Sequence, residues 1–193
     1  SASQIVGMPY GVTSQISTTQ APSSSFFGAS VLKPGYTEIL MEYSEVLFLL
    51  SEANGWSQSY YEQGVRASME KWNIDSAKIN AFVAALPPAN KQNVLTQKYV
   101  SLFMQPFEAW AEYRRTGYPN TLLLPGQSAA LNVATASGQT TYTFTSLIAD
   151  LTDLPTRIYY PTTVQTLNTD NYKAASTAIG GDKMNTKLIW DKN

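Results

Sequence analysis

The first half of the chain carries apolar side chains at intervals of three and four residues, which is the spacing of one face of an α-helix. Tyr43, Val46 and Leu50 give the clearest example. The pattern predicts five helices, from about Thr37 to Ala53, from Ser57 to Trp72, from Asp75 or Ser76 to Leu86, from Asn90 to Phe103 and from Phe107 to Thr116. The first two have about the length of one tetratricopeptide hairpin. We therefore expect a mainly α fold made of tetratricopeptide-like helical hairpins.

Residues that end helices stand between these segments. Asn54-Gly55 closes the first, because glycine adopts the left-handed conformation without a steric cost. Pro87-Pro88 ends the third helix, and Pro106 predicts a kink or a new helix start. Gly117 ends the fifth. These signals set the expected helix limits to within a few residues.

The remaining chain is rich in Ser, Thr, Gly and Pro. Residues 1–35 are expected to be loop. Beyond the helical segment, residues 36–117, the stretch 118–193 is expected to be loop-rich, with short strands and a late helix from about Val164 to Thr177. The expected strands lie at Leu122–Leu124, at Thr141–Thr145 and at Arg157–Pro161. We treat residues 1–193 as one structural portion with these three parts.

Composition narrows the range of functions. The chain has 193 residues, 44% of them hydrophobic, so it can bury a core. Its net charge is −1, whereas binding to a phosphate backbone needs clustered Lys and Arg, so a nucleic-acid partner is not expected. The chain contains no Cys and no His, which removes cysteine nucleophiles, Ser-His-Asp triads and Cys/His zinc sites. Binding or carboxylate chemistry remains.

No apolar run approaches the roughly 18 residues that a membrane-spanning helix needs. The longest, Val46–Leu50, is far too short. The chain opens Ser1-Ala2-Ser3, without an initiator Met or a signal peptide. We interpret the chain as part of a longer precursor whose targeting segment lies elsewhere.

Several motifs resemble one known family in the same order along the chain. They are Tyr43–Ala53, Tyr61–Met69 with its Gly-Val pair, Thr96–Tyr99, the Trp-Ala-Glu-Tyr-Arg-Arg-Thr-Gly-Tyr-Pro run within Glu108–Pro119, Pro155–Pro161, the group Asn168, Asn171, Tyr172 and Ala174, and Gly180–Asp182 followed by Trp190-Asp191. Together they resemble the C-terminal portion of SusD/RagB-type outer-membrane nutrient-binding lipoproteins. Because the matches are collinear over roughly residues 36–191, the resemblance covers most of the chain.

The resemblance implies a non-catalytic surface lipoprotein of SusD-like fold. Such a protein binds a nutrient, usually a glycan and otherwise an oligopeptide, and hands it to a SusC-like TonB-dependent transporter. It would sit at the outer membrane through a lipid anchor outside this chain, with no cofactor. The family's lipid-bearing Cys and most of its tetratricopeptide helices are absent here, so the ligand site can lie partly in another portion of the protein.

Sugar binding uses aromatic faces flanked by hydrogen-bonding groups. Trp56 and Tyr60 place aromatic rings beside polar residues at a helix turn, where loop exposure is expected. Tyr10 and Phe26 lie in Ser- and Gly-rich sequence, and Tyr142 alternates with Thr. These five are the candidate ligand-binding residues. The alternatives are that Trp56 packs against the helical hairpin and that Tyr142 belongs to a half-buried β-hairpin. Trp72, Trp110, Tyr113 and Trp190 are expected in the core.

The carboxylates are weaker candidates for catalytic or metal-binding residues. Glu108 and Glu112 stand four apart on one helix and so cannot straddle a glycosidic bond, as a glycosidase requires. Ion pairs with Arg114 and Arg115 are the better interpretation. Asp150, Asp153, Asp170 and Asp182 offer oxygen ligands but lack the spacing of a calcium loop, so no metal site is assigned.

Two other functions stay open. A helical-repeat module could dock a protein partner without any small-molecule ligand. Loss of glycan binding on substituting exposed loop aromatics would favour nutrient binding, whereas normal binding with lost transporter co-purification would favour the docking module. A hydrolase is the weaker alternative, and it would release reducing ends from a polysaccharide.

Overall fold

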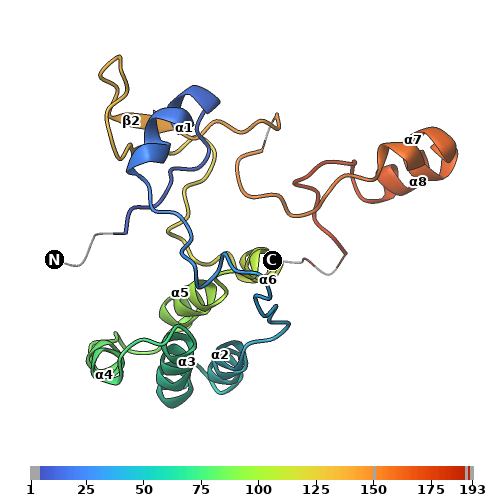
Figure 1. Cartoon of the computed structure of the whole chain (residues 1–193). Coiled ribbons are helices and arrows are strands. Elements are labelled where there is room, and N and C mark those ends of the chain that lie inside the picture. The colour runs from blue at the N-terminus through green and yellow to red at the C-terminus, as the bar shows by residue number, and fades with distance from the viewer. Residues whose placement is uncertain (1–4, 150, 190, 192–193) are drawn as a thin grey trace. The chain divides into compact units, whose positions relative to one another are not determined.

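The computed structural model describes residues 5–149, 151–189 and 191 (Figure 1). Two compact units form the chain, Thr37–Leu122 on the one hand and Ser1–Tyr36 with Leu123–Asn193 on the other. Among the described residues there are eight α-helices and one small two-stranded antiparallel sheet. The mainly helical fold expected from the sequence is confirmed.

The unit Thr37–Leu122 is built from the five expected helices. In Figure 1, α3 lies beside both α2 and α4, and it also packs against α5. α2 and α5 are in contact, and α5 contacts α6. The helices are α2 (Tyr43–Ala53), α3 (Gln58–Lys71), α4 (Ser76–Ala84), α5 (Lys91–Ser101) and α6 (Pro106–Thr116).

The core of this unit is a cluster of four buried residues from α2, α3 and α5, namely Phe48, Tyr61, Val65 and Val94. The rings of Phe48 and Tyr61 lie with centroids 6.4 Å apart. Gly64 belongs to the Gly-Val pair noted in the sequence, and a Cβ there would stand 2.9 Å from the Phe48 ring. The missing side chain therefore allows α3 to approach α2 closely.

Local signals explain the helix limits. The Asp75 carboxylate accepts hydrogen bonds from the backbone of Ala77 and Lys78 at the start of α4. Asn90 likewise accepts from Asn93 at the start of α5. A new helix starts at Pro106, as one of the two expected outcomes there, and Gly117 ends it with φ at +73°.

α2 starts later than its apolar pattern suggested, at Tyr43 rather than near Thr37. Glu42, the residue before it, is extended and buried. Its carboxylate accepts hydrogen bonds from Lys71 and from Gln105. These contacts hold Glu42 outside the helix, and periodicity alone could not indicate them.

The other unit contains a helix in a stretch that we expected to be loop. α1 (Ser14–Gln20) is followed by a short 3-10 helix, η1 (Ala21–Ser23). The hydroxyl of Thr13 accepts from the Ile16 amide at the start of α1. At its end, the fully buried Gln20 side chain donates to the Val133 carbonyl and accepts from the Val133 amide. Contact with a distant segment thus stabilises a Ser/Thr-rich sequence as helix.

The sheet consists of β1 (Ser128–Ala130) and β2 (Thr141–Thr143), paired antiparallel with Ala129 opposite Tyr142. β2 confirms the strand expected within Thr141–Thr145. No strand forms at Leu122–Leu124 or at Arg157–Pro161, where the sequence suggested two. In the second of these stretches, the backbone amide of Arg157 donates to the Met184 carbonyl, outside any ladder.

The late helix is present as two helices, α7 (Thr162–Leu167) and α8 (Thr169–Ala178). Asn168 interrupts them with φ at −139° and ψ at 52°, away from helical values. Within the described part of the chain, no helix is long and apolar enough to span a bilayer.

Candidate functional site

The five candidate ligand residues are divided between the two units. Trp56 and Tyr60 belong to Thr37–Leu122, and Tyr10, Phe26 and Tyr142 belong to the other unit. Each group is therefore considered with the residues around it.

Trp56 lies at the turn between α2 and α3 with φ at +66°, an unusual backbone conformation for a bulky residue. Its amide donates to the Ser51 carbonyl, and its side chain packs against the Phe48 and Tyr61 cluster. Trp56 and Tyr60 are both half-buried. The packing of Trp56 matches the structural alternative considered for it, while part of its surface remains accessible.

Tyr10 and Tyr142, far apart in sequence, lie together beside the β-hairpin. The Tyr142 hydroxyl donates to the Tyr10 carbonyl at 2.9 Å, and Tyr142 is only 6% exposed. Burial raises the pKa of the Tyr142 hydroxyl, so it remains a protonated donor at neutral pH. The Tyr10 hydroxyl in turn accepts from the Leu123 amide and donates to the Leu123 carbonyl. This arrangement fixes the segment around Tyr10 against the hairpin.

Phe144 continues the same face of the hairpin, two residues after Tyr142. Its amide donates to the Gln127 carbonyl, and its carbonyl accepts from the Gly126 amide. The Tyr10 ring meets the Phe144 ring edge-on, with centroids 5.8 Å apart. Gly11 has φ at +71°, and a Cβ there would lie 2.2 Å from the Phe144 ring. Any larger side chain at position 11 would overlap the Phe144 ring unless that ring moved.

A hollow of about 570 Å³ opens beside this aromatic group. It is framed by the segment before α1, by α1 itself, by β2 and by the chain that follows β2. Its lining combines apolar side chains with hydroxyl and amide groups, from Gly11, Val12, Thr13, Ile16, Gln139, Tyr142, Thr143, Phe144, Thr145, Ser146, Leu147, Leu151 and Pro155. We call this space the hairpin hollow. It contains one of the five candidate residues, Tyr142.

A second hollow of about 390 Å³ adjoins it. The two share the stretch Thr143–Ser146 and Leu151. The chain at the end of β2 and just after it therefore lines both hollows.

Phe26 is 78% exposed and lies after η1. It lines neither hollow. Val12, Ile16 and Leu147 also line the hairpin hollow. Their residue types gave no sign of this, because the three side chains come together only in the folded structure. The Thr-Tyr-Thr-Phe-Thr alternation was the one local signal that pointed here.

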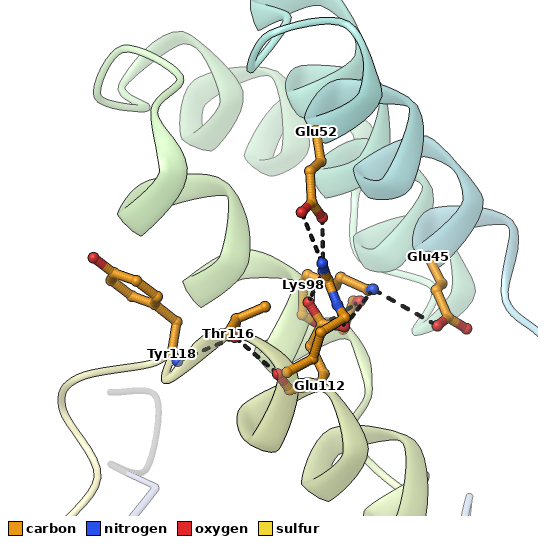
Figure 2. Close-up of polar contacts among 8 residues, drawn as sticks. Glu45, Glu52, Lys98, Glu112, Thr116 and Tyr118 are labelled. Atoms are coloured by element: carbon orange, nitrogen blue, oxygen red, sulfur yellow. Dashed lines mark hydrogen bonds and ion pairs between the residues drawn. The ribbon is translucent and has the colours of Figure 1, made fainter. Parts of the chain in front are cut away.

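Charged groups gather inside the helical unit (Figure 2). Lys98 of α5, only 3% exposed at its side chain, donates to Glu112 of α6 at 2.9 Å and lies 3.9 Å from Glu45 of α2. Arg115 pairs with Glu112 at 2.7 Å and, through both its terminal nitrogens, with Glu52 of α2. The network therefore connects α2, α5 and α6.

The surroundings set the acidity of these groups. Burial, more than any other cause, raises the pKa of Glu45, and the nearby ammonium of Lys98 only partly offsets this. The hydrogen bond from Arg115 lowers the pKa of Glu52. Hydrogen bonds to Glu52 and Glu112 raise the pKa of Arg115, which keeps its charge throughout. Every carboxylate in Figure 2 has a basic partner, which indicates a structural role for the network.

The ion pair expected between Glu112 and Arg115 is confirmed. Glu108 is exposed on the same helix, whereas Glu112 is buried. In the described part of the chain, no group of three or more acidic side chains is close enough to hold a metal ion. Asp150 lies outside the described residues.

Tyr113 is buried as expected, while Trp72 and Trp110 are half-buried. The Arg114 guanidinium lies over the Trp110 ring at 4.6 Å, and Trp72 packs near Phe103. Trp190, the fourth residue expected in the core, lies outside the described residues.

A second buried ion pair joins two of the late motifs. Arg157, in the Pro155–Pro161 motif, forms an ion pair with Asp182, which follows the glycine pair, with its terminal nitrogen 2.9 Å from a carboxylate oxygen. Asp182 also accepts from the Tyr160 amide and from the Tyr172 hydroxyl of α8. The ion pair thus sets the buried guanidinium of one motif against the buried carboxylate of the other.

The fold is that of a helical protein with a small appended hairpin, and comparison with known proteins gives its family. Residues 1–143 match a SusD-like family described as starch-binding and associating with the outer membrane. The chain belongs to this SusD-like family. The resemblance noted in the sequence is thereby confirmed.

Two solved structures support the same family assignment. One, described as Bacteroidetes AC2a SusD-like, is 31% identical with a TM-score of 0.62, and the match covers 80% of this chain and 30% of that one. Another, described as a chitin-binding protein, is 30% identical with a TM-score of 0.58, covering 78% of this chain and 33% of that one. No curated protein sequence matches the chain.

This chain thus spans about a third of the length of these relatives. The family description and the name of the second structure both specify binding, and proteins of this kind are not enzymes. The non-catalytic class that the resemblance implied agrees with this, and the missing Cys and His had left only binding or carboxylate chemistry.

Proposed function

We propose that the protein containing this chain captures a glycan at the outer surface of a bacterial cell, without a chemical step, and passes it to a SusC-like TonB-dependent transporter. A lipid anchor outside this chain would hold it at the outer membrane. The observation that carries the proposal is the match of residues 1–143 to a family described as starch-binding and associated with the outer membrane. The chitin-binding relative also supports a glycan ligand.

The accessible aromatic surface is consistent with this function. Trp56 and Tyr60 in one unit, and Tyr10 with the hairpin hollow in the other, offer ring faces beside hydrogen-bonding groups. Sugar rings present apolar C–H faces and polar edges, so such surfaces suit them. We propose Trp56, Tyr60, Tyr10, Phe26 and Tyr142 as the residues to test first.

Affinity electrophoresis of the intact protein tests glycan capture. Its migration through native gels that contain soluble starch or glycol chitin is compared with migration through plain gels, with serum albumin as the reference. We expect retardation in at least one polysaccharide gel. Migration equal to that of albumin across a broad polysaccharide panel would contradict the proposal.

The alternative is a module that only docks a protein partner. Exposed apolar residues near the start of α2 favour it, since Leu40 is 89% exposed, Met41 66% and Tyr43 68%. Substituting Tyr43 by Ser would then abolish co-purification with the transporter. A purely docking protein would show no glycan retardation even before substitution.

A further inference from the structure

We infer that the hairpin hollow binds the N-acetylhexosamine units of a glycan in preference to unsubstituted glucose units. The inference rests on the proposed glycan-binding function and specifies the sugar that one site would take.

The wall of the hollow is mostly apolar. Val12, Ile16, Leu147, Leu151 and Pro155 all line it, together with the Phe144 ring. A glucose unit has apolar ring faces but carries hydroxyls around its edge and no apolar substituent, and each hydroxyl buried without a partner costs about 1–3 kcal/mol. An apolar wall therefore disfavours plain glucose unless the sugar stays largely in water.

An acetamido group matches this lining better. Its methyl group can be buried against aliphatic side chains, and such burial is favourable. Its N–H and C=O need one acceptor and one donor, and hydroxyl groups provide both. Thr13 and Thr145 are exposed at the lining and carry such hydroxyls close to the aliphatic residues. The hollow thus combines what a methyl group and an amide require.

The lack of charged side chains among the described lining residues narrows the class of ligand further. None of the described residues that line the hairpin hollow is acidic or basic. A uronic acid or a sulfated sugar would lose hydration there without gaining a counter-charge. The hollow is therefore suited to a neutral, amide-bearing sugar.

The size of the hairpin hollow and the presence of a second hollow on the same stretch of chain suit a chain of sugars. A volume of about 570 Å³ lies in the roughly 300–1,000 Å³ range of small-molecule sites. The second hollow is lined by the same stretch, Thr143–Ser146, as the first. A linear oligosaccharide could place one substituted unit in the hairpin hollow and continue into its neighbour.

Leu147 allows a test that spares the fold. Its side chain lines the hollow and is 100% exposed, so Leu147→Ser removes a ligand contact without opening a cavity. Leu167 of α7 is 87% exposed and lines neither hollow, which makes Leu167→Ser the matched control. Circular dichroism of both variants checks that the fold is unchanged.

Isothermal titration calorimetry of the intact protein with chitopentaose and maltopentaose gives the measurement. We expect tighter binding of chitopentaose, weakened about tenfold by Leu147→Ser through lost apolar contact and unchanged by Leu167→Ser. Tighter binding of maltopentaose, or equal affinities of the two leucine variants for chitopentaose, would overturn the inference while leaving glycan capture intact. Binding of no glycan by either calorimetry or electrophoresis would overturn the proposed function as well.

Discussion

Gly11 illustrates how one residue can determine the shape of the hairpin hollow. Its φ of +71° lies in the left-handed region, and the Phe144 ring occupies the space that a Cβ would need. Gly35 has almost the same φ, +73°, but nothing lies within 4 Å of its Cβ position. Comparing substitutions at the two glycines therefore distinguishes the cost of backbone strain from the cost of steric overlap with the ring.

We expect Gly11→Ala to destabilise the protein by about 1–3 kcal/mol more than Gly35→Ala does. Both substitutions carry the left-handed penalty of roughly 1–2 kcal/mol, and only the first also displaces a packed ring. Urea denaturation of the intact protein measures the difference. Equal losses in the two variants would mean that Phe144 moves away freely, in which case the ring does not hold the hollow's shape.

Single residues also show the limits of sequence reasoning. The Thr-Tyr-Thr-Phe-Thr run correctly indicated a hairpin edge, yet it could not show that Tyr142 is buried with its hydroxyl on Tyr10. Both residues were candidates, but their proximity depends on a contact across most of the chain. For Trp56, both exposure at the turn and packing against the helical hairpin were open, and the sequence does not signal the positive φ with which the structure packs it on the core.

At the scale of elements, the ion network of α2, α5 and α6 is expected to stabilise their packing. Glu112→Gln would leave the buried Lys98 with only Glu45, at 3.9 Å, as a carboxylate neighbour. Because removing one partner of a buried pair leaves an uncompensated charge, we expect a loss of about 3–5 kcal/mol. Chemical denaturation at neutral pH measures this loss.

Glu45→Gln is the matched control for that substitution. Lys98 keeps its 2.9 Å bond to Glu112, and the substitution removes a carboxylate whose pKa burial raises. A raised pKa means that ionised Glu45 destabilises the fold as pH rises through the folded-state pKa. We therefore expect a change within about 1 kcal/mol at neutral pH. A loss as large as that of Glu112→Gln would show that Glu45 is the main partner of Lys98.

Acid should weaken the contact between α2 and α6. Arg115 lowers the pKa of Glu52, so the contribution of this pair is present above the ordinary carboxyl pKa and is lost as pH falls through the lowered value. Arg115 is 44% exposed, so Glu52→Gln should cost under about 1 kcal/mol at neutral pH. Denaturation curves at about pH 7 and about pH 2.5 should show this difference disappearing in acid. A difference that persists at low pH would argue against an electrostatic origin.

The helices were more predictable than the irregular segments, and the reason is physical. α2 to α6 carry an apolar face together with strong end signals such as Asp75, Asn90 and Gly117, all of which are local. α1 lacks such a face and depends on the contact of Gln20 with Val133. Long-range contacts of this kind decide most of the structure outside Thr37–Leu122.

At the scale of the whole molecule, the two units differ in how the chain builds them. Thr37–Leu122 is one continuous segment, and the other unit joins two segments that are distant in sequence. The continuous unit contains its own apolar cluster and its own ion network. Its contacts are mostly between neighbouring helices, an arrangement that favours rapid and independent folding.

We therefore expect the segment 37–122, produced alone, to fold into a helical domain. Far-UV circular dichroism should show helix, and heating should give one cooperative transition. Phe48→Ala is the control, since loss of this 1% exposed core ring should cost about 3–5 kcal/mol and lower or abolish the transition. Leu40 and Phe107 are 89% and 80% exposed, so melts at several concentrations are needed to separate folding from association. A gradual melt that Phe48→Ala leaves unchanged would mean that these helices need the rest of the protein to form their core.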